Sequence, residues 1–382
     1  MILLYYAVTT TIIWGFISLY LLINSYKIKS LSKIQPELST SPPSVSVIVA
    51  VRNEEDNLEN ALETICRLTY PNYSILLIDD RSTDRTPQIV DRFAERYTFV
   101  KAVHLKQLPQ AWLGKNYAMY KGYMLSDAEW ILFTDADIEY QPESLTKAIN
   151  YAIKNQLDHL TVFPEVRSRS TLFNGIMDTF RMMLEIRLRP WNAINAKSKA
   201  YIGVGAFNLI KRSAYEIAGT HARLPLRPDD DLKLGEQVKI AGLKQDVLYG
   251  RSELKLEWYT SVQQFIQGLM KNMFSTYDYK VAKAMPSAFL TLLIFVLPVP
   301  LLLTGDLLEK AMAIIILLFQ CILFQYRKES SGKLWHVLLI PYAAVIVLYI
   351  ILLSTYRTLQ QKGIYWRESF YPLTELKKNV EK

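Results

Sequence analysis

The chain has 382 residues, enough for two or three structural units, and its 51% hydrophobic and 21% charged residues exclude disorder and disfavour a purely soluble enzyme. The net charge of +8 is not gathered into basic blocks, which favours acidic lipid surfaces or phosphorylated ligands over nucleic acid. Two widely separated cysteines and four scattered histidines predict neither a disulfide framework nor a zinc site.

Residues 1–26 are predicted to be a transmembrane anchor. Ile2–Asn24 is an uncharged run that could cross a bilayer of roughly 30 Å as a helix. A basic n-region and a small-residue cleavage site are missing, which disfavours a cleaved signal peptide. Three lysines follow the run, so we expect an outside N-terminus and a cytoplasmic body, reached through a linker over residues 27–43.

Residues 44–280 are predicted to form an α/β catalytic domain, because short apolar strands alternate there with amphipathic helices. The expected strands are Val45–Val51, Ser74–Asp80, Phe99–Leu105 and Trp130–Asp137, and the expected helices are Asn57–Arg67, Thr86–Tyr97, Lys115–Leu125 and Leu232–Ala241. This alternation predicts right-handed crossovers and a mostly parallel sheet. Ligands of such sheets bind beyond the carboxyl ends of the strands.

Polar clusters follow three of the expected strands, at Arg52–Asn57, Asp79–Asp84 and Thr134–Asp137. Helix capping accounts for Asn57 and Asp84. It does not require two acids two residues apart at the end of a buried strand. Asp135 and Asp137 would repel each other unless a cation lay between them. Mg²⁺ and Mn²⁺ accept one or two carboxylates plus substrate phosphates, so the pattern favours a divalent metal.

The same segments resemble family 2 glycosyltransferases, in the same order along the chain. The resemblance is carried by Val45–Glu55, Ile78–Thr86 and Asp135–Asp137. It extends from about residue 45 to 274 and implies a GT-A fold, which is Rossmann-like with a mostly parallel sheet. It also implies inverting, metal-dependent transfer of a hexose from a nucleotide-diphosphate sugar. By this resemblance Glu54 and Asp80 contact the nucleoside, Asp137 holds the metal on the donor diphosphate, and Asp135 lies near the ribose or the metal.

Two further segments resemble the membrane-anchored branch linked to hopanoid and carotenoid glycosylation. Residues 112–115 resemble its Trp-x-Gly-Lys segment, in which Gly114 permits close backbone approach and Lys115 begins a helix that favours phosphate. A glycine hinge and a solvated lysine are the alternative. Residues 268–272 resemble a Gly-x-x-Lys-Asn element, in which Lys271 could reach the diphosphate or lie at the membrane interface. The Gln-x-x-Arg-Trp motif of processive synthases is absent from the sequence.

Three consecutive acids, Asp229–Asp231, precede the expected helix at residue 232. Capping and dipole effects would account for one or two of them. An inverting transfer also needs a carboxylate that takes the proton of the acceptor hydroxyl. The run resembles the family's Glu-Asp-x-x-Leu element, whose Asp is the base, and this makes Asp231 the preferred base and Asp230 its neighbour and fallback. His221 could add a metal or acceptor contact.

Residues 165–199 carry seven basic and three acidic side chains among Met and aromatic residues. Such a helix can lie in lipid headgroups or be an ordinary half-buried helix. Membrane segments are predicted again over 281–357, before a basic tail at 358–382. Their apolar runs are Pro286–Thr304, which is interrupted by prolines, Ala311–Tyr326, which is short for a crossing, and Leu334–Tyr356. Two crossings and one re-entrant or interfacial segment would keep the tail inside, whereas three crossings would not.

Together these features predict a multi-pass cell-membrane glycosyltransferase with a cytoplasmic catalytic domain. It would move a sugar from a UDP- or GDP-type donor to a lipid acceptor, namely an isoprenoid, carotenoid or glycerolipid, with Mg²⁺ or Mn²⁺ as cofactor. Nucleic acid is not an expected partner. One alternative is a processive polysaccharide synthase. Another is a non-catalytic nucleotide-binding membrane scaffold, which the retained acidic strand ends disfavour.

Overall fold

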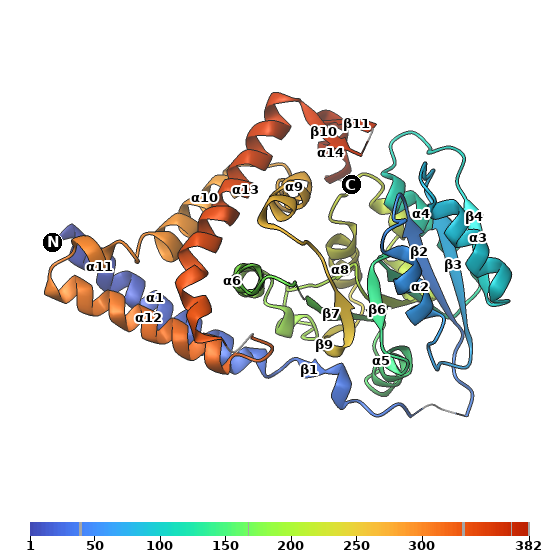
Figure 1. Ribbon diagram of the computed structural model, residues 1–382, viewed down its shortest axis with the longest axis horizontal. Coiled ribbons are helices and arrows are strands. Elements are labelled where there is room, and N and C mark those ends of the chain that lie inside the picture. The colour runs from blue at the N-terminus through green and yellow to red at the C-terminus, as the bar shows by residue number, and fades with distance from the viewer. Residues whose placement is uncertain (38–39, 167, 331–332, 368, 381–382) are drawn as a thin grey trace. The chain divides into compact units, whose positions relative to one another are not determined.

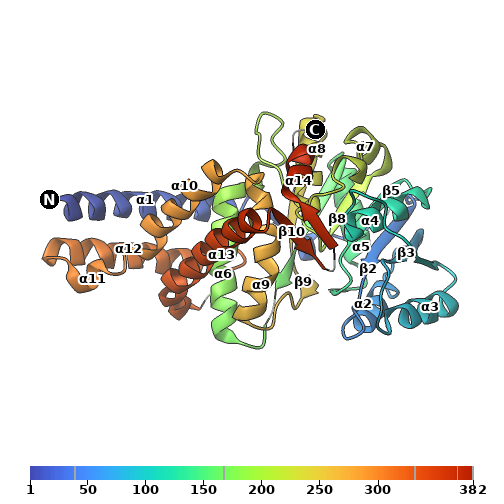
Figure 2. The ribbon, with the colours of Figure 1, turned by 90° about the horizontal axis from the view of Figure 1, so that it is seen from above.

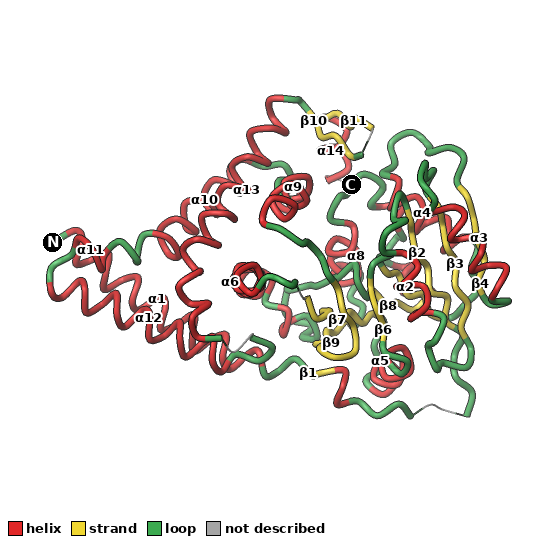
Figure 3. Tube along the Cα trace, in the orientation of Figure 1, coloured by secondary structure: helices red, strands yellow, loops and turns green. Residues whose placement is uncertain are grey.

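The computed structural model describes residues 1–37, 40–166, 168–330, 333–367 and 369–380. The chain divides into two compact units, whose helices and strands are shown in Figures 1 and 3. The sheet unit comprises Ile28–Arg167, Pro190–Trp258 and Lys378–Lys382, and the helical unit comprises Met1–Lys27, Ser168–Arg189 and Tyr259–Lys377. Residues 168–189 and 259–280 therefore lie in the helical unit, although the predicted catalytic range includes them.

Within the described residues, nine strands of the sheet unit form one mixed sheet. They are β1 (Lys29–Ser30), β2 (Val45–Val51), β3 (Tyr73–Asp79), β4 (Val100–His104), β5 (Trp130–Thr134), β6 (Ile138–Tyr140), β7 (His159–Val166), β8 (Asn208–Lys211) and β9 (Gln245–Leu256). Their order is β1-β9-β7-β8-β5-β2-β3-β4, and β6 pairs with β9. The β8 strand is antiparallel to β5 and β7, and β6 is antiparallel to β9, while the other pairs are parallel. The predicted mostly parallel α/β sheet is confirmed.

Helices cover both faces of this sheet (Figure 2). The odd-numbered valines of β2 enter one core, together with α2 (Leu58–Ile65), α3 (Thr86–Arg96) and α5 (Ser144–Lys154). Ile48 enters the opposite core, together with α4 (Gly114–Met124), α7 (Arg212–Ile217) and α8 (Asp230–Ile240). Because side chains alternate between two buried faces, β2 reads in sequence as a continuous apolar run.

Two element boundaries differ from the prediction in a way that affects the polar clusters. The strand expected to end at Asp137 ends at Thr134. The reason is that the backbone N–H of Asp135 leaves the strand ladder and donates to the carbonyl oxygen of Gly205 at 3.2 Å. The helix expected from residue 232 begins at Asp230, so two of the three acids lie in its first turn.

The helical unit contains most of the apolar helices. Its elements are α1 (Ile2–Ser25), α6 (Thr171–Leu188), α9 (Val262–Asn272), α10 (Val281–Thr291) with a π-helical turn at Leu292–Val296, α11 (Leu301–Thr304), α12 (Leu307–Tyr326), α13 (Ile340–Gln360), β10 (Gly363–Trp366) and β11 (Ser369–Pro372). The helix α14 (Leu373–Val380) follows. In the described part of the chain, three helices are long and apolar enough to cross a membrane, at Ile2–Ser25, Leu307–Tyr326 and Leu334–Gln360.

The first C-terminal apolar run is the short one, not the second. The second run forms a 20-residue helix because it begins at Leu307, so the prediction that it is short for a crossing is wrong. The first run is helical only over Val281–Val296, and Pro298 and Pro300 follow. Its irregular last turn is capped from α1, since the Tyr6 hydroxyl and the Trp14 indole donate to successive carbonyl oxygens there, of Leu293 and Ile294. This satisfies backbone groups that a bilayer would leave unpaired.

A buried ionic cluster joins α6 to the segment after α12. Arg327 is fully buried and donates to Asp178 Oδ1 and to Glu185 Oε2, each at 2.7 Å. The hydroxyl of Ser330 donates to Asp178 Oδ2 at 3.2 Å. The acidic side chains of α6 are thus turned into the protein, which fixes one face of this helix within the helical unit.

We expect Arg327→Met to lower the free energy of unfolding by about 3–5 kcal/mol, because the buried Asp178 and Glu185 each lose an ion pair with Arg327, while Glu185 keeps its pair with Arg181. The matched control is Lys283→Met, which removes a half-exposed ion pair with Asp278 in the same unit and is expected to cost less than about 1 kcal/mol. Denaturant unfolding of the detergent-solubilised protein measures both values. Equal effects of the two substitutions would contradict this account.

Candidate active site

Eight residues are predicted from the sequence to be the base or to bind the donor or metal, and seven of them lie in the sheet unit, at or near the carboxyl ends of its parallel strands. Glu54 and Asp80 follow β2 and β3, and Asp135 and Asp137 follow β5. Lys115 lies in the first turn of α4, and Asp230 and Asp231 lie in the first turn of α8. Lys271 is on α9 of the helical unit, so its role stays a prediction.

Asp80 is buried against the beginning of α4. Its carboxylate accepts hydrogen bonds from Arg81 Nε at 2.8 Å and from Arg52 at 3.3 Å. A Cβ atom on Gly114 would overlap this carboxylate, so only glycine lets the helix begin so close to it. The strand end therefore presents a carboxylate that is already neutralised by two guanidinium groups.

Lys115 links the acidic end of β5 to the acidic beginning of α8. Its Nζ donates to Asp135 Oδ1 at 2.7 Å and lies 3.8 Å from Asp230 Oδ1. Burial would lower the pKa of Lys115, but the nearby carboxylates of Asp135, Asp230 and Asp231 raise it above its ordinary value. The ammonium group therefore stays charged, and it is placed to meet an anion that approaches this edge of the sheet.

Asp230 and Asp231 are neighbours in sequence but differ in their environments. Burial would raise the pKa of Asp230, yet Lys115 and His221 hold it below its ordinary value. Burial and then the charge of Asp230 raise the pKa of Asp231 to about 7. Asp231 Oδ2 also accepts the backbone N–H of Gly205 at 2.7 Å. A carboxyl group with a pKa near 7 is suited to accept a proton at neutral pH.

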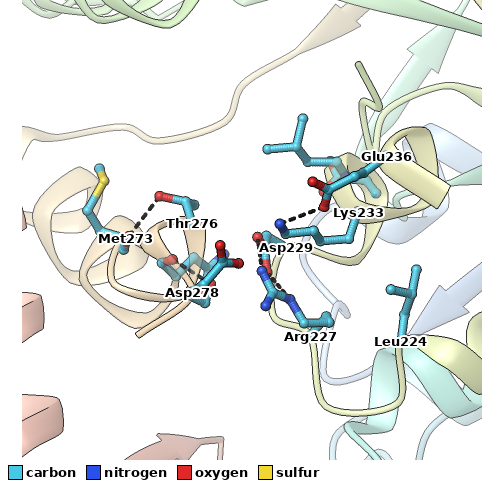
Figure 4. A network of polar contacts seen from close by, with 12 residues as sticks. Leu224, Arg227, Asp229, Lys233, Glu236, Met273, Thr276 and Asp278 are labelled. Atoms are coloured by element: carbon cyan, nitrogen blue, oxygen red, sulfur yellow. Dashed lines mark hydrogen bonds and ion pairs between the residues drawn. The ribbon is translucent and has the colours of Figure 1, made fainter. Parts of the chain in front are cut away.

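The first of the three consecutive acids has a separate partner. Arg227 donates to both carboxylate oxygens of Asp229, at 3.0 and 2.9 Å, and both side chains are buried (Figure 4). Asp229 is therefore occupied in holding its own loop. Asp230 and Asp231 are left as the two acids of the run that face Lys115 and Gly205.

The carboxylates after β2 and β5 provide oxygen donors for a divalent ion. Burial raises the pKa of Asp137 to about 7, and the charges of Asp135 and Glu54 add to this shift. A cation would relieve this repulsion. In the described ranges, no three Asp, Glu, His or Cys side chains are spaced to enclose a metal ion. The donor set fits an ion with one or two protein carboxylates and other ligands from phosphate and water.

The loop that connects these acids, over residues 203–205, was not among the residues predicted to form the site. Gly205 accepts from the backbone N–H of Asp135 and donates to Asp231. A Cβ atom on Gly203 would overlap the backbone carbonyl of Asp231. The signal that could have indicated this loop is the Gly-Val-Gly at 203–205, since paired glycines mark close backbone approach.

We expect Gly203→Ala to destabilise the sheet unit by roughly 1–3 kcal/mol, because the new methyl group meets backbone that cannot move independently of α8. The matched control is Gly242→Ala, where nothing lies within 4 Å and only the positive φ of 73° opposes alanine. That control is expected to cost about 1 kcal/mol. Thermal unfolding measures both, and a control that loses as much stability would contradict the packing argument.

His221 is buried and does not join a metal-ligand group in the described chain. Its Nε2 lies 3.4 Å from Asp230 Oδ2. The metal or acceptor contact of His221 stays a prediction, and in the structure the histidine contacts an acid of the cluster.

Known proteins resemble this chain in sequence and in fold. Residues 46–217 match the family described as Glycosyl transferase family 2. A beta-monoglucosyldiacylglycerol synthase of a Nostoc species is 33% identical over 204 residues, which are 52% of this chain and 42% of that protein. This chain thus spans less than half the length of that relative. A 4,4'-diaponeurosporenoate glycosyltransferase of Staphylococcus haemolyticus is 23% identical over 260 residues, which are 67% of this chain and 68% of that protein.

Among solved structures, the mannosyltransferase PcManGT from Pyrobaculum calidifontis, in complex with GDP-Man and Mn²⁺, resembles this chain with a TM-score of 0.54. The match covers 94% of this chain and 99% of that one, at 18% identity, and it shows a shared fold. The resemblance to family 2 and the expected fold class, a GT-A domain with apolar helices near both ends, are confirmed.

Proposed function

We propose that this chain, whose residues 46–217 match the glycosyl transferase family 2 model, transfers a sugar from a nucleotide-diphosphate donor to a lipid acceptor. The observation that carries the proposal is the cluster at the carboxyl edge of the sheet. There the charged Lys115 lies between the carboxylates of Asp135 and Asp230, and the neighbouring Asp231 has its pKa raised to about 7. Such a site can hold an anionic donor and accept a proton from a hydroxyl group.

Each residue of the site has a proposed role. Glu54 and Asp80 contact the nucleoside, and Asp135 lies near the ribose or the metal. Asp137 holds a divalent ion, which when bound would offset negative charge on the leaving diphosphate. The Mn²⁺ in the mannosyltransferase structure is consistent with that cofactor.

Lys115 and Lys271 are proposed to contact the diphosphate. As the bond between the sugar and the diphosphate breaks, negative charge grows on the leaving oxygen, and a fixed ammonium group stabilises it. Asp231 takes the proton of the acceptor hydroxyl group. The oxygen of that hydroxyl attacks the anomeric carbon from the side opposite to the leaving diphosphate. The result is inversion. Asp230, with its lowered pKa, is the poorer base of the pair.

The acceptor is proposed to be a glycerolipid, isoprenoid or carotenoid. The names of two relatives, a glucosyldiacylglycerol synthase and a diaponeurosporenoate glycosyltransferase, support a lipid of one of these kinds. Three helices of membrane-crossing length in the described chain support a membrane location. We propose an anchor at residues 1–26, a cytoplasmic catalytic region at 44–280 and membrane segments at 281–357. Two crossings, by α12 and α13, keep the tail at 358–382 inside.

The test uses membranes that contain the full chain. UDP- and GDP-sugars are supplied singly with diacylglycerol or an isoprenoid alcohol, in the presence of Mn²⁺, Mg²⁺ or a chelator. The expected result is a lipid with one added hexose mass and an equal amount of nucleoside diphosphate. A polymeric product would replace this proposal with the processive synthase, and no turnover with any donor would overturn it.

A further inference from the structure

A chain of buried polar contacts extends from α7 to Lys115, entirely within the sheet unit. The hydroxyl oxygen of Tyr215 lies 2.5 Å from His221 Nδ1, and His221 Nε2 lies 3.4 Å from Asp230 Oδ2. The other carboxylate oxygen, Asp230 Oδ1, lies 3.8 Å from Lys115 Nζ. Tyr215 and His221 are at most 1% exposed. Neither of these two side chains has a role in the proposed function so far.

The hydrogen-bond partners determine where the protons of Tyr215 and His221 lie. The Tyr215 oxygen accepts the backbone N–H of His221 at 2.9 Å, so its own buried proton needs an acceptor. The acceptor within reach is His221 Nδ1. A neutral imidazole whose Nδ1 accepts carries its proton on Nε2. That N–H is therefore directed at the carboxylate of Asp230.

The ring of His221 has little freedom to turn. Phe133 packs edge-on against it, with ring centroids 5.0 Å apart, and Tyr215 packs at 5.6 Å. The two oxygens of Asp230 thus have different partners, His221 for Oδ2 and Lys115 for Oδ1. This pairing fixes the rotation of the Asp230 carboxylate.

The position of Lys115 depends on that rotation. Its ammonium group lies 2.7 Å from Asp135 and 3.8 Å from Asp230, so Asp135 would draw it away if Asp230 turned. We propose that His221, oriented by Tyr215, is a positioning residue that sets the Asp230 carboxylate and thereby holds the Lys115 ammonium group where the donor diphosphate binds. The inference rests on the proposed function, because it assigns Lys115 to the diphosphate.

The first test compares two changes at one position. His221→Leu removes the donor to Asp230 and is expected to lower kcat/KM for the donor roughly 10- to 100-fold, as for a misplacement of a catalytic group by about 1 Å. His221→Gln keeps an N–H of similar reach and is expected to restore most of that loss. The affinities of the same proteins for UDP and for GDP are measured by titration, which gives a readout that does not depend on turnover.

A double-mutant cycle separates positioning from general damage. If His221 acts through Lys115, then His221→Leu has little further effect in a Lys115→Met background, on either turnover or UDP and GDP binding. If His221→Leu instead damages the fold in general, it lowers turnover and binding by the same factor in the wild-type and Lys115→Met backgrounds. That result would overturn the inference. Equal activity of wild type and His221→Leu would overturn it as well.

Tyrosine variants give a matched control. Tyr215→Phe removes the hydroxyl that orients His221, and it is expected to show part of the His221→Leu effect. Tyr151→Phe also removes a buried hydroxyl, one that donates to Asp246 at 2.7 Å away from this chain of contacts, and it is expected to leave transfer unchanged. If wild type itself neither turns over a nucleotide sugar nor binds UDP or GDP, the proposed function fails and this inference fails with it. Wild-type turnover together with equal effects of the two tyrosine changes would overturn the inference alone.

Discussion

Asp231→Asn is expected to lower sugar transfer by roughly 10²- to 10⁴-fold, which is the usual contribution of a general base. The affinity for UDP or GDP is expected to stay within about threefold of wild type, because the proposed base does not contact the nucleotide. The acceptor for the N–H of Leu232 is lost, but the amide keeps the size of the side chain, and its oxygen can still accept the backbone N–H of Gly205. It cannot take a proton from the acceptor hydroxyl. Lipid product measured by mass and nucleotide affinity measured by titration give the two values.

The matched control is Asp230→Asn, the same chemical change one residue earlier. Because Asp230 is paired with Lys115 and His221, its loss is expected to weaken transfer less and through the donor side. A larger loss of transfer for Asp230→Asn than for Asp231→Asn would move the base to Asp230.

The pH profile follows from the same assignment. Asp231 acts in its ionised form, and its pKa is raised to about 7. At saturating Mn²⁺, kcat/KM of the wild type is therefore expected to rise about tenfold per pH unit below 7 and to level off above it. The residual activity of Asp231→Asn is expected to lack that rise. An unchanged profile in this variant would contradict the role of Asp231.

Much of the sheet unit could be predicted from local sequence. The β2 strand has the predicted bounds. A continuous apolar run between polar residues is typical of a strand that is buried on both faces of a sheet. The polar clusters at the strand ends also gather as expected, since parallel strands end at one edge. The end of β5 could not be predicted from local sequence, because it depends on a hydrogen bond from Asp135 to Gly205, about 70 residues away.

The contacts that define the site in detail could not be read from periodicity. The pairing of His221 with Asp230, and of Gly205 with Asp231, joins loops that have no repeating pattern. The position of α6 within the helical unit rests in part on Arg327, which is 142 residues from Glu185 and 149 from Asp178 in sequence. A basic amphipathic segment indicates only that one face is buried, and not against which partner.

Asp137→Asn is expected to reduce transfer by at least about 100-fold and to abolish its dependence on Mn²⁺, because the proposed metal loses its carboxylate ligand. Titration of Mn²⁺ in the presence of UDP or GDP is expected to show weaker binding than in the wild type. Asp84→Asn is the matched control. Just before α3, Asp84 accepts the backbone N–H of Thr86 at 2.9 Å and that of Glu55 at 3.2 Å, and it has no proposed part in metal binding.

The same two variants are expected to change stability in opposite directions when metal is absent. Asp137 is half-buried near Asp135 and Glu54, so a neutral amide removes repulsion and is expected to raise Tm by a few degrees at pH 8. Asp84→Asn removes one of the two oxygens that accept those backbone N–H groups and is expected to lower Tm. A gain in stability with a loss of transfer would mean that Asp137 is kept for binding a cation at a cost to the fold. A loss of stability in Asp137→Asn would instead indicate a structural carboxylate, and Asp135 would become the preferred ligand.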